Sequence, residues 1–162
     1  MSARVAPGAG SSNVATGIPV LDHLLTLLAQ AGGFHLALEV AAGDAETEVA
    51  GAGRSLGESF ADLLRAQDAP GHASSFLPAD EALAQVTLEV SGRPQVHSNV
   101  DLSEAHAGGL DSDLAARFLD ALAEAAGLTL HVRLIHGDDS QHVLEAIFKA
   151  LGAALAQASR AR

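Results

Sequence analysis

The sequence contains no cysteine, no tryptophan and no tyrosine, and aromatic residues make up only 3% of its 162 residues. The absence of cysteine excludes disulfide bonds, thiolate metal ligands and cysteine nucleophiles. The scarcity of aromatic rings removes the platforms on which single-stranded nucleic acids stack, and a formal net charge of −11 repels a phosphate backbone. We therefore expect no nucleic-acid partner.

Long hydrophobic runs are also missing. Polar residues or glycines interrupt each apolar stretch before it reaches the roughly 20 residues of a membrane span, and residues 1–15 have no hydrophobic signal core. We therefore expect a cytoplasmic protein with no membrane partner. Residues 1–15 are small and turn-forming, which predicts a flexible N-terminus followed by a single domain over residues 16–162.

The sequence does contain an internal repeat. A leucine-rich helical pattern ends at a glycine, a strand with alternating apolar residues follows, and a Gly-Asp pair closes the unit. The same order returns later with a constant shift, because 127 − 33, 130 − 36 and 137 − 43 all equal 94. The repeat predicts an α+β fold built from a duplicated unit, with sheets backed by helices. We place the first half at about residues 16–100 and the second at about residues 105–160.

Each unit is expected to continue into a second helix, at about residues 56–65 in the first half and 142–158 in the second. Between the units, the alternation of apolar and polar residues predicts a strand over residues 85–90. Residues 95–100 are expected to pair with that strand as a hairpin, and residues 78–81 are expected to form a turn before it.

Histidines are the most informative polar residues, because a chain without cysteine can build a transition-metal site only from histidine with aspartate or glutamate. His142 and Glu145 have i, i+3 spacing, which places an imidazole and a carboxylate on one helix face. The pair is either a ligand pair or a solvated surface pair. His23 lies on a leucine-rich helix, where it is either a ligand or packed against the other half, and His35 is expected to be solvated.

From residue 16 to about residue 158, the chain resembles the imidazoleglycerol-phosphate dehydratase family. Four stretches carry the resemblance. They are TGIPVLDHLL (16–25), GGF through GD (32–44), PADEAL through SGRP (78–94), and GLTLHVRL through HVLEAIFKA (127–150).

The resemblance implies a fold of tandem α+β halves, each similar to domain 2 of ribosomal protein S5. It also implies an activity, the manganese-dependent dehydration of imidazole glycerol phosphate in histidine biosynthesis. Family members form trimers that assemble into shells of 24 subunits, and residues of neighbouring subunits meet at each pair of manganese ions. We therefore expect a homo-oligomer, either a trimer or a trimer-based 24-mer.

Only part of the family's ligand set is present. The resemblance implies that His23, His142 and Glu145 are retained manganese ligands. The family's first histidine of the second-half pair is replaced by Gln141, and the lone helical histidine of the second half falls at 23 + 94 = 117, which is Arg117. The family's Asp-His-His-x-x-Glu segment of the first half corresponds to residues 43–53, which contain no histidine.

Two outcomes are compatible with these exchanges. In the first, Glu46, Glu48 and Gln141 act as substitute oxygen donors and rebuild a two-metal site. In the second, Arg117 forms a salt bridge with Glu145 or Glu48 and takes the place of the metal, because a guanidinium is always protonated and cannot ligate a cation.

Phosphate recognition is reduced as well. The resemblance implies that Arg93 contacts the substrate phosphate, although the residue is equally compatible with a simple turn position. The family's second phosphate arginine, its C-terminal Ser-Thr-Lys-Gly clamp and its N-terminal strand with an active-site glutamate have no recognisable counterpart.

Two functions from different classes follow. The first is a hydro-lyase, an imidazoleglycerol-phosphate dehydratase. The second is a non-catalytic paralogue that acts as a structural or regulatory subunit and assembles with an intact dehydratase.

Overall fold

The computed structural model describes residues 2–100, 106–107 and 110–160. The first part of the chain forms β1 (Ser2–Pro7), β2 (Ser12–Ala15), α1 (Pro19–Gly32), β3 (Phe34–Glu39) and α2 (Ala45–Leu64). The second part forms β4 (His72–Ala79), β5 (Ala82–Val90), β6 (Gln95–Ser98), β7 (His106–Ala107), β8 (Leu110–Asp111), α3 (Ser112–Ala126), β9 (Leu128–His136) and α4 (Ser140–Ser159).

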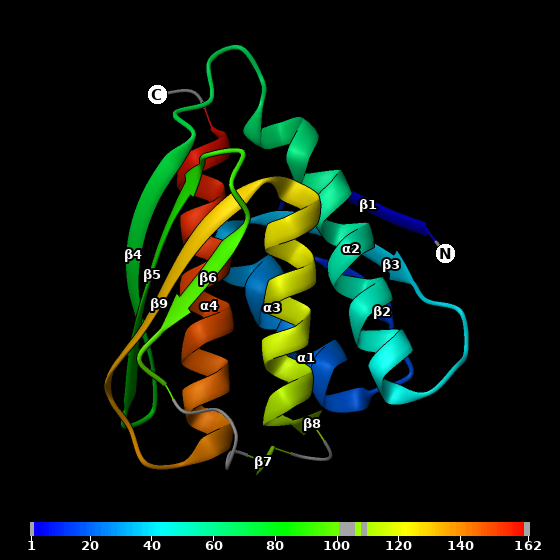
Figure 1. Cartoon of the computed structure of the whole chain (residues 1–162), viewed down its shortest axis with the longest axis vertical. Helices are drawn as coiled ribbons and strands as arrows, with labels where there is room; N and C mark the ends of the chain where they lie inside the picture. Colours follow the sequence, from blue (N-terminus) through cyan, green and yellow to red (C-terminus); the bar gives the residue numbers. More distant parts are fainter. Residues whose placement is uncertain (1, 101–105, 108–109, 161–162) are drawn as a thin grey trace.

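The helices lie between two sheets (Figure 1). One sheet has the strand order β1-β3-β2 and packs against α1 and α2, and the other has the order β4-β5-β9-β6 and packs against α3 and α4. The two layers meet through the pairs α1 with α4 and α2 with α3, and the four helices direct their N-terminal ends toward the same end of the molecule. The α+β class is therefore confirmed.

Both halves repeat the same strand pattern around a central strand. β3 pairs with β1 in antiparallel and with β2 in parallel orientation, and β9 pairs in the same way with β5 and β6. The connections cross the start of the central strand at matching points, since the Gly8 N–H donates to the Gly33 carbonyl (2.9 Å) and the Gly92 N–H to the Gly127 carbonyl (3.1 Å). The duplication is therefore real, and β4 is an addition to the second half.

The boundary between the halves differs from the expected one. The strands over residues 72–98 belong to the sheet of the second half, so the first unit comprises residues 2–64 and the second residues 72–159. The expected start of the second half near residue 105 lies outside the described residues. The difference arises because the repeated unit begins with its two flanking strands and not with its first helix.

The N-terminal segment also differs from its expected flexible state. β1 and β2 occupy both edges of β3, so most of residues 2–15 are tied into the sheet by backbone hydrogen bonds. Small, turn-forming residues have little strand propensity of their own, which explains why the sequence did not indicate these two strands.

The expected hairpin between residues 85–90 and 95–100 is wrong, because β9 lies between β5 and β6 and pairs with both. The expected turn is found in part, since β4 continues through Pro78 and Ala79 before the chain reverses at Asp80 and Glu81. The second helix of the first half begins at Ala45 instead of near residue 56. Three glycines within it lower its intrinsic helix propensity, and burial against α3 compensates for that loss.

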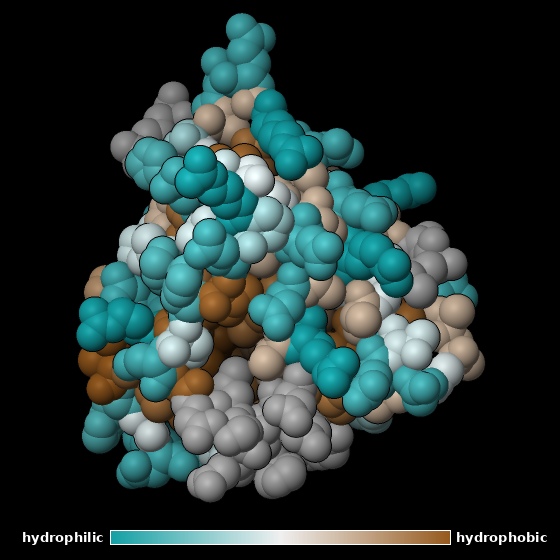
Figure 2. Space-filling view, viewed as in Figure 1, coloured by the Kyte–Doolittle hydropathy of each residue, from teal (hydrophilic) through white to brown (hydrophobic). Residues whose placement is uncertain are grey.

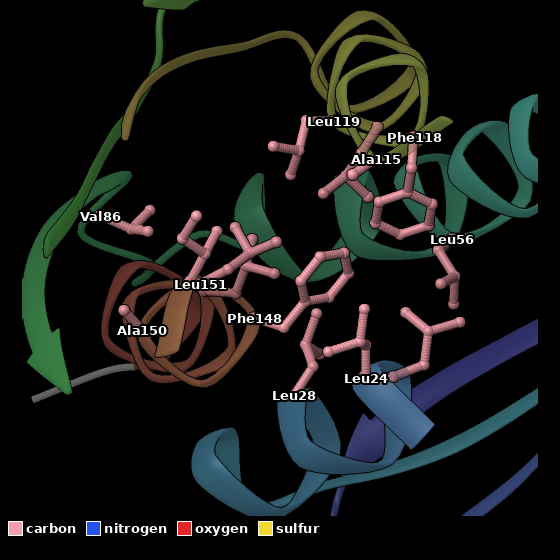
Figure 3. Packing of buried hydrophobic residues seen from close by; sticks show 14 of the residues in the cluster. Leu24, Leu28, Leu56, Val86, Ala115, Phe118, Leu119, Phe148, Ala150 and Leu151 are labelled. Carbon is pink, nitrogen blue, oxygen red and sulfur yellow. The ribbon is translucent and has the colours of Figure 1, made fainter. Parts of the chain in front are cut away.

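Leucine, alanine and phenylalanine fill the space between the sheets. Phe118 of α3 and Phe148 of α4 lie with their ring centroids 5.4 Å apart, and Leu24, Leu28 and Leu56 surround them (Figure 3). The surface in the view of Figure 2 is mostly hydrophilic, with a hydrophobic recess between β6 and α3 and further hydrophobic atoms at the lower left edge. Among the described residues, no helix is both long and apolar enough to cross a membrane.

Candidate functional site

The N-terminal ends of α1 and α4 bring His23 and Glu145 together. The His23 Nε2 atom lies 2.9 Å from Glu145 Oε2, and the Gln141 side-chain amide donates to the same oxygen at 3.3 Å. The two helices run in parallel, so both present the positive ends of their dipoles here, which favours a carboxylate. The glutamate is the better shielded partner, at 15% exposed against 49% for the histidine.

His142 lies one turn of helix earlier and is held by a different set of carboxylates. Its Nδ1–H donates to Glu81 Oε2 (2.7 Å), and its Nε2 lies 3.2 Å from Asp80 Oδ2. Both acids belong to the turn between β4 and β5, where Asp80 adopts a left-handed conformation (φ 52°) that aspartate tolerates. His142 therefore contacts Asp80 and Glu81, and it is not part of the His23–Glu145 pair.

The same turn is fastened to the start of α4 through the backbone. The Asp139 N–H donates to Glu81 Oε1 (3.0 Å), and the Asp139 carboxylate caps α4 by accepting from the His142 N–H (3.1 Å). The hydrogen bond from Asp139 and then the one from His142 lower the pKa of Glu81 to about 2. The hydrogen bond to Glu81 raises the pKa of His142. With carboxylates at both nitrogens, the imidazolium form of His142 is favoured.

The pseudo-equivalent end of α2 and α3 carries a different pair. Arg117 Nη2 lies 3.6 Å from Glu46 Oε1, and both side chains are more than half exposed. The expected salt bridge of Arg117 with Glu145 or Glu48 is therefore wrong in its partner. Glu145 lies on the other helix pair and is already bonded to His23. Glu46 occupies the position on α2 that corresponds to Gln141 on α4. The two helices start 95 residues apart (140 − 45), and 141 − 46 gives the same shift.

Arg93 lies far from all of these residues. It follows β5, whose other end leads to the Asp80–Glu81 turn, so roughly 25 Å of strand separates the two regions. Its N–H donates to Ser91 Oγ (3.0 Å) and its carbonyl accepts from Thr129 Oγ1 (3.1 Å), which orders the turn. Arg93 and His72 line a hollow of about 650 Å³ on the outer face of the four-stranded sheet.

The residues present do not fit the two-manganese centre that the resemblance implies. Within one subunit, no three potential donors from histidine, aspartate and glutamate among the described residues converge on one point. The end formed by α2 and α3 places the guanidinium of Arg117 at a ligand position, where it would repel a dication, and Thr47 and Ala50 occupy the α2 positions that correspond to His142 and Glu145.

Sequence reasoning named His23, His142 and Glu145 as retained ligands and Gln141 as an altered ligand position. The structure places His23, Glu145 and Gln141 together, whereas His142 contacts Asp80 and Glu81 instead. Sequence reasoning missed Glu81 and Asp139, which organise the start of α4. Glu81 lies in the PADEAL stretch that carries the family resemblance, so the sequence marks it as a candidate. Its contact with His142 could not be predicted, because it depends on the pairing of β5 with β9, the strand before α4.

The comparisons with known proteins agree with one another. The family model of imidazoleglycerol-phosphate dehydratase matches residues 16–155. An imidazoleglycerol-phosphate dehydratase of Pelobacter propionicus is 40% identical over 158 residues, with 94% of this chain and 80% of the relative covered. One from Clostridium botulinum strain Kyoto is 41% identical, with 93% of this chain and 79% of the relative covered.

Solved structures extend the similarity to the fold. The crystal structure of imidazoleglycerol-phosphate dehydratase from Staphylococcus aureus superposes with a TM-score of 0.88 at 33% identity, covering 98% of this chain and 92% of that one. The IGPD of Pyrococcus furiosus, solved in complex with (S)-C348, gives a TM-score of 0.84 at 26% identity, covering 99% and 88%. By sequence and by fold, the chain belongs to the imidazoleglycerol-phosphate dehydratase family.

Proposed function

We propose that the chain is a non-catalytic member of this family, which keeps the scaffold and serves as a structural or regulatory subunit. The observation that carries the proposal is the Arg117–Glu46 pair. It occupies, on α3 and α2, the place that His23 and the Gln141–Glu145 segment occupy on α1 and α4. A fixed positive charge at this place opposes a dication, so one of the two helix-end clusters is unsuited to hold manganese.

The remaining cluster supports the same proposal. His23, His142 and Glu145 are present, but they are divided between two sets of hydrogen bonds. A divalent transition metal needs its donors within about 2.0–2.3 Å of one point. Carboxylates at both nitrogens of His142 must be displaced before that ring can donate a lone pair to manganese.

The position of Arg93 supports an assembly. A small phosphorylated substrate cannot span the roughly 25 Å of β5 that separate Arg93 from the helix ends and the Asp80–Glu81 turn. If Arg93 contacts a phosphate near such a cluster, the cluster belongs to another subunit. We propose that this other subunit is a second copy in a trimer or trimer-based 24-mer, or an intact paralogue whose site this chain completes.

The test is a measurement of metal and turnover together. The purified protein is dialysed against manganese, bound metal per subunit is measured by mass spectrometry, and dehydration of imidazole glycerol phosphate is assayed, with the Staphylococcus aureus enzyme as the positive control. The proposal expects less than one manganese per subunit and no turnover above buffer. Two manganese ions per subunit together with turnover would overturn it.

Catalysis is the second candidate, and the 40% identity to curated dehydratases favours it. The mixed-assembly role is examined separately by refolding the chain with an intact dehydratase and weighing the complexes by mass photometry. Mixed particles whose activity falls on Arg93→Ala substitution in this chain alone would support the regulatory role. Separate homo-oligomers would remove it.

A further inference from the structure

The outer face of the four-stranded sheet carries a histidine pair that the family site does not use. β6 and β9 run in parallel and in register, which places His97 directly beside His131. Their rings are stacked, with centroids 5.1 Å apart and planes inclined by 19°. Both side chains are exposed, so solvent and solutes reach them directly.

The partners of these two rings differ from those of the histidines at the helix ends. His23 and His142 face carboxylates, whereas in the described part of the chain neither His97 nor His131 forms an ion pair. The Nε2 of His97 lies 2.8 Å from the side-chain oxygen of Gln95. Because that oxygen can only accept, a neutral His97 ring that donates Nε2–H to it has its lone pair on Nδ1.

Metal-binding histidines commonly have one ring N–H held by an oxygen while the other nitrogen binds the ion, and the contact with Gln95 allows His97 to use Nδ1 in this way. Two nitrogens that bind one ion at about 2.0–2.1 Å lie roughly 3–4 Å apart. Rings 5.1 Å apart on neighbouring strands reach that separation by small side-chain rotations, which exposed side chains permit.

The surroundings provide room for the remaining ligands of an ion. His131 lines the hollow of about 650 Å³, and Gln95 and Thr129 line the same space. Water molecules in this hollow can complete the coordination and hydrogen-bond to the polar side chains around it.

We propose that His97 and His131 form a two-imidazole site for a late first-row divalent cation, with water in the other coordination positions. Imidazole donors favour Cu²⁺, Ni²⁺ and Zn²⁺, and Mn²⁺ stands at the weak end of the same series. The site lies on β6 and β9, away from the His23–Glu145 cluster at the helix ends. It is therefore independent of the proposed loss of catalysis.

The test is a titration of the full chain with Ni²⁺ by calorimetry at neutral pH, with His97→Gln, His131→Gln and the double variant. We expect one ion per subunit, at least a tenfold loss of affinity in each single variant, and no larger loss in the double variant. His72→Gln is the matched control, because His72 lies on the same sheet face and lines the same hollow. It is expected to bind like the unsubstituted protein.

A second readout fixes the donors. The electron paramagnetic resonance spectrum of bound Cu²⁺ is expected to show two nitrogen ligands in the unsubstituted chain and one in either single variant. Equal affinity in all variants, or a loss confined to one histidine, would overturn the proposal. An excess of Mn²⁺ is expected to leave Ni²⁺ affinity unchanged. Competition by Mn²⁺ that is abolished by Glu145→Gln would instead place the ion at the helix ends and contradict both proposals.

Discussion

The two halves of the molecule share their helix contacts and differ at their helix ends. Gly152 of α4 packs on the carbonyl of Leu28, and Gly57 of α2 packs on the carbonyl of Leu122, so the same crossing occurs twice. A Cβ at Gly57 would lie 2.7 Å from the Leu122 oxygen, and one at Gly152 would overlap the Leu28 oxygen. A backbone contact of this kind tolerates only glycine, whereas exposed side chains at the helix ends are free to change.

The sheets show a related difference. The second half has β4, and α4 packs against β4 and β5 with fully buried alanines at positions 146, 150 and 154. The described residues of the first half form no strand that corresponds to β4, and two of the matching α2 positions are the half-buried Ser55 and Ser59. Ser59 Oγ donates to the Ala3 carbonyl at 3.2 Å. The sequence of α2 is thus suited to a partly solvated flank.

The largest predicted effect is on the shared crossing. Gly152→Ala and Gly57→Ala each force a methyl group against a backbone carbonyl, and the helices must separate. Overpacking of this kind costs about 3 kcal/mol, which exceeds the roughly 1 kcal/mol that alanine gains in helix propensity. Urea unfolding followed by circular dichroism measures the loss.

Glu58→Ala on the exposed face of α2 is the control for Gly57→Ala, because it changes a helical position without adding a contact. It is expected to stay within about 0.5 kcal/mol of the unsubstituted protein. If either glycine variant is as stable as this control, the repeated crossing is not the constraint that keeps the two halves alike.

The parts of the fold that follow from local patterns could be predicted from sequence. The 94-residue shift identified α1, β3, α3 and β9 because each has an apolar period and a terminating glycine. The two strands before α1 could not be predicted in this way, since their small residues carry no period and their pairing with β3 is tertiary. For the same reason, the insertion of β9 between β5 and β6 was missed.

The candidate site divides along the same line. Residue identities at matched positions predicted a group of His23, His142 and Glu145, of which the structure brings His23 and Glu145 together. The exchange of a ligand histidine for Arg117 predicted that this arginine would meet an acid. The choice of Glu46 as that acid depends on the start of α2 at Ala45, which its glycines obscured. The sequence shows which residues stand at the ligand positions, but the residue at which α2 begins determines that Glu46 faces Arg117.

The next prediction concerns the C-terminal ends of the helices. Arg160 donates to the Gly33 carbonyl (2.7 Å) and lies 5.1 Å from the centre of the Phe34 ring. In the other half, Arg65 approaches Gly127, but the residue that follows the glycine is Leu128, which offers no ring. Arg160→Ala is expected to lower the free energy of unfolding by about 1 kcal/mol. Arg65→Ala is expected to lower it by less than about half of that.

Thermal and urea unfolding of the two variants measure the difference, and Arg160→Lys serves as the matched control. Lysine keeps the charge but cannot reproduce the planar contact with Phe34, so an intermediate stability is expected. If Arg160→Ala and Arg65→Ala lower the free energy of unfolding equally, the contact between Arg160 and the Phe34 ring contributes nothing to stability.

A smaller effect is expected at the helix cap of α2. Asp44 Oδ1 accepts from the Thr47 N–H (2.8 Å), and this hydrogen bond lowers the pKa of Asp44 below its ordinary value of 3.8. A lowered pKa stabilises the fold above pH 4, and this contribution disappears as the pH falls through the folded-state pKa. Asp44→Ala is expected to reduce the Tm at pH 7 by about 2–4 °C.

The pH dependence separates charge from capping. Asp44→Asn retains a capping oxygen, so its Tm at pH 7 is expected to fall by only about 1 °C. The gap between Asp44→Asn and the unsubstituted protein is expected to narrow below pH 4, as the pH falls through the lowered pKa of Asp44 in the folded state and the carboxyl becomes protonated. A gap that stays constant from pH 7 to pH 3 would contradict a charged cap.

The smallest effects are predicted for the exposed ion pairs, where the halves differ most in chemistry. His23 and Glu145 lie 2.9 Å apart with the glutamate largely shielded, whereas Arg117 and Glu46 are 3.6 Å apart and both exposed. Double-mutant cycles with glutamine are expected to give a coupling free energy of about 0.5 kcal/mol for the first pair and near zero for the second. Raising the salt concentration to 0.5 M should reduce the first value. A coupling above about 1 kcal/mol for Arg117 and Glu46 would mean that this pair holds α2 and α3 together. The exchange of residues at these helix ends would then have introduced a stabilising ion pair, and would not simply reflect the loss of a ligand function.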